Sequence, residues 1–160
     1  ASCRVDPEVI RIRREKGLTT TYYVCCADRF PNMFTFSPSP EAVYSAWYAV
    51  ALDLDGFLRW AYNSWVEDPL RDSRFRTWPA GDTYMVYPDA RSSIRFERLR
   101  EGIQDAEKIR VLRQEYAKEN SAASLEKLTA LEAAISGFAT LEPAEGWTER
   151  LNQAKSLLNR

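Results

Sequence analysis

Histidine is absent from the 160 residues of this chain. Its absence removes the commonest general base near neutral pH, the usual zinc ligand and every nucleophile that depends on a Ser-His or Cys-His pair. Any acid–base chemistry must therefore use carboxylates. Cysteine is scarce as well, since Cys3 and the adjacent Cys25 and Cys26 are too few and too badly spaced for a disulfide scaffold or a four-ligand metal site. We expect no metal and no cofactor.

The chain also lacks an excess of charge of either sign, with 22 Lys and Arg against 23 Asp and Glu. Residues 1–90 carry 10 basic and 12 acidic side chains, and residues 91–160 carry 12 and 11. Neither part has the basic excess that binding to nucleic-acid phosphates requires. No apolar stretch is long enough to cross a bilayer. We therefore expect neither nucleic acid nor membrane as a partner, and the hydrophobic fraction of 45% is that of an ordinary globular domain.

The first residues lack the basic segment followed by an apolar segment that begins a secretory signal peptide. Two interpretations follow: the chain starts after processing, or it starts in the middle of a longer gene product. We favour the second interpretation.

The first half of the chain is rich in aromatic side chains and predicts alternating helices and strands. Of the 20 Phe, Trp and Tyr residues, 16 lie between residues 22 and 87. Asp6-Pro7 and Ser39-Pro40 each combine an N-cap residue with proline at the first helical position, and predict helices over 7–16 and 40–53. Strands are predicted over three segments that are rich in aromatic and apolar residues: 19–26, 57–63 and 83–87. We expect the first two strands to be buried on both faces and paired in parallel, which makes the class α/β.

The second half predicts three long helices. Apolar residues recur at intervals of three to five over residues 94–116, 125–138 and 147–158, and each series marks one helix face. Between the two halves, residues 65–81 show no periodicity and predict a long loop, a kind of segment that often carries function. A parallel sheet of about three strands is unusually small. Either the long helices cap this sheet, or the missing strands come from an N-terminal region outside the chain or from a second copy, and we favour the interpretation as a fragment.

An ordered series of motifs resembles a known region. The motifs are residues 56–65 (GFLRWAYNSW), Asp68-Pro69, residues 78–82 (WPAGD), Tyr87-Pro88, Ser93-Ile94-Arg95 and residues 99–105 (LREGIQD). From about residue 19 to about residue 113, the chain resembles the C-terminal part of the catalytic barrel in glycoside hydrolase family 123, the β-N-acetylgalactosaminidases, and their uncharacterised bacterial relatives.

The resemblance implies the C-terminal portion of a (β/α)8 barrel over residues 1–116, closed by a helix from residue 92 to about 116, with a helical extension over 117–160. In such enzymes an adjacent Asp-Glu pair performs the hydrolysis of N-acetylhexosaminides, and this sequence contains no Asp-Glu dipeptide. We therefore expect the catalytic pair to lie upstream and this chain to be inactive by itself, with carbohydrate as its partner. The resemblance also implies a secreted or periplasmic protein.

Candidate substrate-binding residues follow from the rule that barrel active sites lie at the C-terminal ends of the strands. They are Trp60, Tyr62, Asn63, Trp65, Trp78 and Asp82. Aromatic rings can stack on the apolar faces of a sugar, and an amide can bind its hydroxyls. Core packing is the alternative for Trp60 and Tyr62, and pinning of the loop by hydrogen bonds is the alternative for Trp78 and Asp82. Strand alternation places Trp60 on one face and Arg59 and Asn63 on the other, and we expect the second face to line the barrel lumen.

Other candidates have simpler explanations. Cys25 and Cys26 would point to opposite faces of a strand, so we expect small buried apolar residues rather than a metal or redox pair. Glu67 and Asp68 precede a proline in the long loop and predict a turn. A second function class also stays open, in which the chain is a non-catalytic carbohydrate-binding or protein-interaction module. A barrel fragment with an open sheet edge should form homo-oligomers, whereas a finished module should be a monomer.

Overall fold

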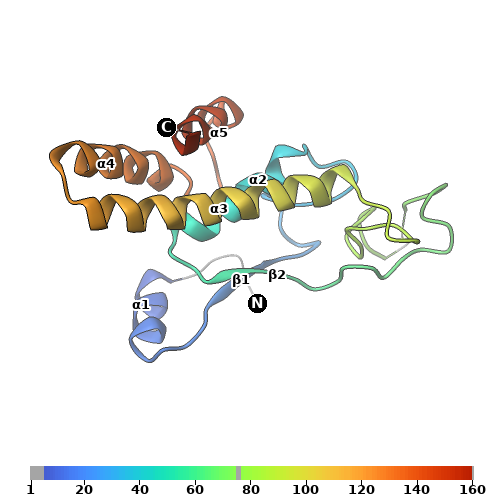
Figure 1. Cartoon of the computed structure of the whole chain (residues 1–160). Coiled ribbons are helices and arrows are strands. Elements are labelled where there is room, and N and C mark those ends of the chain that lie inside the picture. The colour runs from blue at the N-terminus through green and yellow to red at the C-terminus, as the bar shows by residue number, and fades with distance from the viewer. Residues whose placement is uncertain (1–5, 75–76, 160) are drawn as a thin grey trace.

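A two-stranded parallel sheet organises the first half of the chain in the computed structural model, which describes residues 6–74 and 77–159. Strand β1 (Thr21–Val24) pairs with β2 (Gly56–Arg59), with Tyr22 opposite Phe57. Helix α2 (Pro40–Ala51) connects the two strands and covers one face of the sheet (Figure 1). The predicted parallel βαβ unit is therefore confirmed.

The helix-start signals also correspond to real helices. Helix α1 (Pro7–Glu15) begins after Asp6, whose side chain accepts a hydrogen bond from the Glu8 backbone N–H. Helix α2 begins after Ser39, which makes no side-chain cap bond. Nine of the 12 residues of α2 are buried, because the sheet lies on one side of this helix and α3 lies on another.

Both strands are shorter and more exposed than the sequence predicts. Tyr22 and Val24 are buried, but Thr21 is exposed and the Leu58 side chain is 55% exposed. The expectation of burial on both faces is wrong, because α2 covers only one of the two faces. The assignment of faces is wrong as well. Phe57 packs against Tyr22 with ring centroids 5.1 Å apart, so the face that carries Phe57 and Arg59 is the helix-covered one.

The third predicted strand, residues 83–87, does not form. This segment makes two isolated antiparallel bridges instead, Asn63 with Tyr84 and Tyr87 with Arg91. The Met85 N–H donates to the Tyr62 carbonyl at 2.7 Å, which fixes the segment against the chain that leaves β2. Within the described residues the sheet has two strands, not three.

The three C-terminal helices lie where the periodicity predicts them. They are α3 (Ile94–Glu119), α4 (Ala122–Ser136) and α5 (Trp147–Ser156), and a 3-10 turn η1 (Leu157–Asn159) follows. Helix α3 packs along α2, and α4 and α5 stack on the side away from the strands (Figure 1). No helix in the described part of the chain is both long enough and apolar enough to span a membrane.

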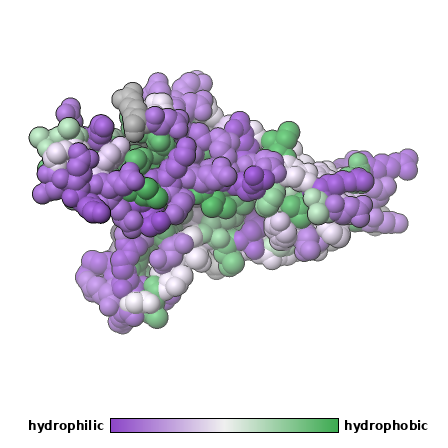
Figure 2. Space-filling model, viewed as in Figure 1, coloured by the Kyte–Doolittle hydropathy of each residue, from purple (hydrophilic) through white to green (hydrophobic). Residues whose placement is uncertain are grey.

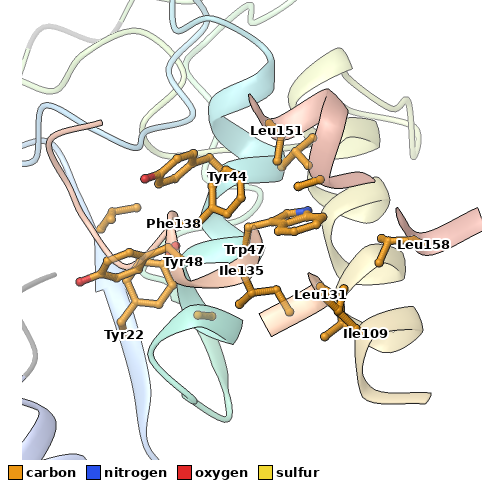
Figure 3. Close-up of a cluster of buried hydrophobic side chains, with 14 of the residues drawn as sticks. Tyr22, Tyr44, Trp47, Tyr48, Ile109, Leu131, Ile135, Phe138, Leu151 and Leu158 are labelled. Atoms are coloured by element: carbon orange, nitrogen blue, oxygen red, sulfur yellow. The ribbon is translucent and has the colours of Figure 1, made fainter. Parts of the chain in front are cut away.

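One buried cluster joins both halves of the chain. Figure 3 shows aromatic side chains of α2 and β1 packed with aliphatic side chains of α3, α4 and α5. The largest fully buried members are Tyr22, Tyr44, Trp47, Ile109, Leu131 and Ile135. The Trp47 indole donates to Asp105 Oδ2 at 3.1 Å, so its one polar atom is satisfied inside the cluster. Residues after 116 therefore pack on the same core as the strands. Hydrophilic residues cover most of the face of the molecule that Figure 2 shows.

Candidate functional site

A buried ion pair lies at the carboxyl ends of the two strands. Arg59, the last residue of β2, donates from Nη2 to Asp82 Oδ1 at 2.7 Å and to the Asp82 carbonyl at 2.9 Å. The Arg59 side chain is 6% exposed and that of Asp82 is fully buried. Nη1 of the same guanidinium donates to the Val24 carbonyl at the end of β1, at 3.4 Å. Arg59 therefore connects both strand ends to the loop that carries Asp82.

Asn32 organises the loop between β1 and α2. Its side-chain amide donates to the carbonyls of Cys25 and Asp28, both at 2.8 Å. Its Oδ1 accepts from Arg59 Nη1 at 3.2 Å, and its backbone N–H donates to Glu41 Oε2 at 2.7 Å. Burial raises the pKa of Glu41, and the Asn32 backbone N–H opposes that shift. Asn32 is itself buried, so this loop is held in place from inside.

A second buried arginine fixes the loop from the other side. Arg95, in the first turn of α3, donates from Nη1 to the carbonyls of Met33 at 2.6 Å and Gly81 at 2.8 Å. Gly81 has a φ of +81°, and a Cβ there would lie 2.7 Å from both Arg95 Nη1 and Thr35 Cγ2. Glycine is required at this position because of its backbone conformation and because of this close approach. Residue 81 and its neighbour Asp82 are therefore placed by direct packing.

Two partly exposed tryptophans lie beside the ion pair. Trp60 follows Arg59 directly, and Trp78 directly precedes the turn that carries Asp82, whose N–H donates to the Pro79 carbonyl. The rings of Trp60 and Trp78 meet edge to face with centroids 5.7 Å apart, and they are 41% and 37% exposed. Segments that are 18 residues apart in sequence thus present one aromatic surface next to a buried carboxylate.

The ion pair is strongly desolvated. Burial raises the pKa of the Asp82 carboxyl, and the Arg59 guanidinium and the Trp60 indole oppose that shift. Burial lowers the pKa of Arg59, which the charge of Asp82 opposes. Asp82 Oδ2 and Arg59 Nε are buried without a partner at hydrogen-bonding geometry. Charged groups that are buried in this way cluster at functional sites, which makes the pair a candidate.

The remaining predicted residues lie in a second group. The exposed Asn63 bridges to the buried segment that ends the long loop, and the Trp65 indole donates to the Val86 carbonyl at 2.7 Å. The Tyr62 ring is 48% exposed and packs edge to face on Phe96 of α3, at 5.9 Å. The structure brings Trp60, Trp78 and Asp82 together, and holds these other three along the chain that leaves β2.

The groups set aside on sequence grounds do not form a site. Cys25 and Cys26 are half-buried rather than fully buried, and burial raises the pKa of the Cys26 thiol. Residue Cys3 lies outside the described residues. The described ranges contain no group of three His, Cys, Asp or Glu residues that could hold a metal ion. The Asp68 carbonyl accepts from the backbone of residues 71 and 72, as expected for a turn.

Sequence reasoning missed three residues of this site: Arg59, Asn32 and Arg95. Arg59 gave a signal, because it is a lone charge in an otherwise apolar and aromatic segment. Arg95 belongs to one of the motifs quoted above, but its partners lie 62 and 14 residues away. Nothing in the sequence distinguishes Asn32 from any other loop amide.

Comparison with known proteins agrees with this geometry. A family model described as glycoside hydrolase 123, catalytic domain, matches residues 2–112. The chain belongs to glycoside hydrolase family 123. The resemblance carried by the motifs is thus confirmed, and the site lies wholly inside the family match. No curated protein sequence matches this chain.

A solved structure also matches. It is a family 123 glycoside hydrolase from Clostridium perfringens, described in connection with glycolipid glycan hydrolysis. The two chains share 28% sequence identity, and the TM-score is 0.78. The match covers 96% of this chain and 29% of that chain. The chain therefore spans less than a third of the length of this family 123 structure.

Proposed function

We propose that these residues form part of the substrate-binding wall of a (β/α)8 barrel glycoside hydrolase that acts on N-acetylhexosaminides. The observation that carries the proposal is the Trp60–Trp78 surface beside the buried Asp82, at the carboxyl edge of two parallel strands. Barrel enzymes bind their substrates at that edge. The family relationship supports a carbohydrate ligand.

Under this proposal the chain binds sugar and does not hydrolyse it. Glycosidases of most families need two positioned carboxyl groups, or one carboxyl group with help from the substrate. Asp82 is held in the ion pair with Arg59, so we assign it to substrate binding rather than to proton donation. We propose that an Asp-Glu pair from outside these 160 residues performs the chemistry, and that Tyr62, Asn63 and Trp65 extend the wall.

The division of the chain forms part of the same proposal. Residues 1–116 would be the barrel segment and residues 117–160 a helical extension that covers its outer surface. Residue 147, in the extension, supports this arrangement, because the Trp147 ring contacts Phe30 and Tyr44 with centroids 5.3 and 5.4 Å apart. Under this proposal the extension packs against the loop that follows β1 and stabilises it.

The test uses the 160-residue chain with a chromogenic β-N-acetylgalactosaminide and with free N-acetylgalactosamine. We expect no turnover of the first, and saturable quenching of tryptophan fluorescence by the second. Trp60→Ala and Trp78→Ala should each weaken binding severalfold, because a stacking surface is lost. Phe36→Ala is the matched control, since Phe36 is 68% exposed and stacks only on Phe34 among the described ring pairs. Hydrolysis at an enzymatic rate by the chain would contradict the proposed division of labour.

A further inference from the structure

The Arg59–Asp82 pair retains two unused hydrogen-bonding atoms. Asp82 uses Oδ1 to accept from Arg59, while its Oδ2 has no partner at full hydrogen-bonding geometry, and the Trp60 indole is the other side-chain donor that acts on this carboxylate. Arg59 uses both terminal nitrogens, while its Nε has none. Within the described part of the chain, four buried side-chain atoms lack a partner, and two of the four belong to this pair.

Buried polar atoms without a partner destabilise a fold, so native proteins keep few of them. Two such atoms in one ion pair, next to a partly exposed aromatic surface, indicate that a ligand supplies the missing partners. An ionised carboxylate oxygen only accepts hydrogen bonds, and an arginine nitrogen only donates them. A hydroxyl group can do both, and is therefore the group that suits this pair.

We propose that Asp82 Oδ2 accepts a hydrogen bond from one hydroxyl group of the sugar ring that stacks at Trp60 and Trp78. This inference rests on the proposed function and adds to it the determinant of specificity. Asp82 selects a sugar that has a free hydroxyl at one ring position. Analogues without that hydroxyl leave the buried carboxylate oxygen unpaired, and such sites reject them.

Arg59 acts as the positioning residue for Asp82. Its guanidinium donates to the Val24 carbonyl, the Asn32 Oδ1 and two oxygen atoms of Asp82, so its plane is fixed by three different segments. This arrangement sets the rotation of the Asp82 carboxylate, with Oδ1 engaged and Oδ2 left over. Lysine could supply the charge at this position but not the planar set of donors.

The sugar must displace a contact to reach Asp82. The carboxylate is fully covered, and the Trp60 indole is one of its neighbours. Trp60 and Trp78 touch each other only edge to face. Under this proposal the sugar hydroxyl takes the place of the Trp60 indole beside the carboxylate, so the indole N–H groups of Trp60 and of its ring neighbour Trp78 report the event.

Nuclear magnetic resonance of the indole N–H groups in the 160-residue chain tests this inference. The titrants are N-acetylgalactosamine and its three analogues that are deoxygenated at ring position 3, 4 or 6. Signals of Trp60 and Trp78 should move. The signal of Trp47, which is buried and donates to Asp105, should not move, and it reports an intact fold.

The variants are Asp82→Asn, which keeps the side-chain volume, and Arg59→Lys, which keeps the charge. We expect Asp82→Asn to weaken N-acetylgalactosamine binding about tenfold, the usual effect of a lost hydrogen bond to a charged group. One deoxy analogue should bind the wild-type chain about tenfold more weakly and lose nothing further in Asp82→Asn. Arg59→Lys should weaken the binding of N-acetylgalactosamine, and this variant should bind N-acetylgalactosamine and that analogue equally well.

The possible failures are distinguishable. If Trp60 and Trp78 respond to the sugar but Asp82→Asn binds as tightly as wild type, the hydroxyl subsite is wrong and the aromatic surface remains. Equal binding of all three analogues by the wild-type chain has the same meaning. Full discrimination retained by Arg59→Lys refutes the positioning role. If no sugar moves the Trp60 or Trp78 signal, the proposed function itself fails.

Discussion

The close approach of α2 and α3 depends on one glycine, and replacing it should destabilise the chain. A Cβ on Gly102 would lie 3.0 Å from each of three atoms: the Cβ of Ala46, and the Cα and carbonyl oxygen of Val43. Two of these atoms are backbone and cannot turn away. Gly102→Ala therefore has to push the two helices apart by a few tenths of an ångström.

The magnitude follows from two opposing effects. Alanine is better than glycine inside a helix by about 1 kcal/mol. Overpacking of a close interface costs about 1–3 kcal/mol. Since α2 and α3 form the most extensive helix contact of the chain, we expect the second effect to prevail, with a net loss of about 1 kcal/mol. For a chain of this size, 1 kcal/mol corresponds to a Tm change of about 3 °C.

Thermal unfolding followed by circular dichroism measures the change, with Gly137→Ala as the matched control. Gly137 ends α4 with a φ of −65°, and a Cβ there would meet only the Ala134 carbonyl at an ordinary 3.5 Å. The control should keep or raise the Tm, and Gly102→Ala should lower it. Because Arg95 stands on α3, the same variant should also disturb the loop around Gly81. A Tm for Gly102→Ala equal to or above that of Gly137→Ala would refute this reasoning.

Two further predictions concern the extension and the sheet. Burial raises the pKa of Glu101, but hydrogen bonds from Lys155 and Arg98 lower this pKa by more. Burial lowers the pKa of Lys155, but its hydrogen bonds to Asp105 and Glu101 raise this pKa by more. The ion pairs of Lys155 therefore stabilise the fold fully between pH 4.5 and pH 10.5, the ordinary pKa values of a glutamate and a lysine. This stabilisation is lost as the pH falls through the lowered pKa of Glu101, or rises through the raised pKa of Lys155. Lys155→Met should lower the free energy of unfolding by about 2 kcal/mol at pH 7 and flatten its pH profile in urea unfolding. An unchanged profile would contradict a stabilising role for the ion pairs of Lys155 with Glu101 and Asp105. Light scattering should show self-association through the open sheet, and Leu58→Glu should reduce it; a strictly monomeric wild-type chain would argue for a finished module.

The sequence was sufficient where the controlling interactions are local. The cap at Asp6 and the apolar periodicity after residue 93 act within one or two helical turns, and both predictions hold. The pairing of β1 with β2 was predictable because a helix between two apolar segments favours a parallel crossover. The motif series correctly indicated family 123, since it depends on residue identity rather than on three-dimensional contacts.

The sequence failed where a partner lies far along the chain. Residues 83–87 have strand composition, but they make only two isolated antiparallel bridges, Asn63 with Tyr84 and Tyr87 with Arg91, and no continuous ladder. The face that holds Arg59 was misassigned because a charge normally avoids a covered face. The carboxylate that pairs with the Arg59 charge belongs to Asp82, which lies 23 residues later in the sequence. Half of the candidate site was found from residue type, and the arginines that position it were not.

Helix α3 is one uninterrupted rod of 26 residues, about 39 Å long. Its first turn holds the backbone around Gly81, its middle is tied to α5 through Lys155, and its last turns carry α4. Because a helix of this length is stiff, a displacement of its C-terminal end also moves its first turn, and with it the loops near the strand ends. We expect substitutions in the last forty residues, remote from any ligand, to alter how finely the tryptophans discriminate between sugars.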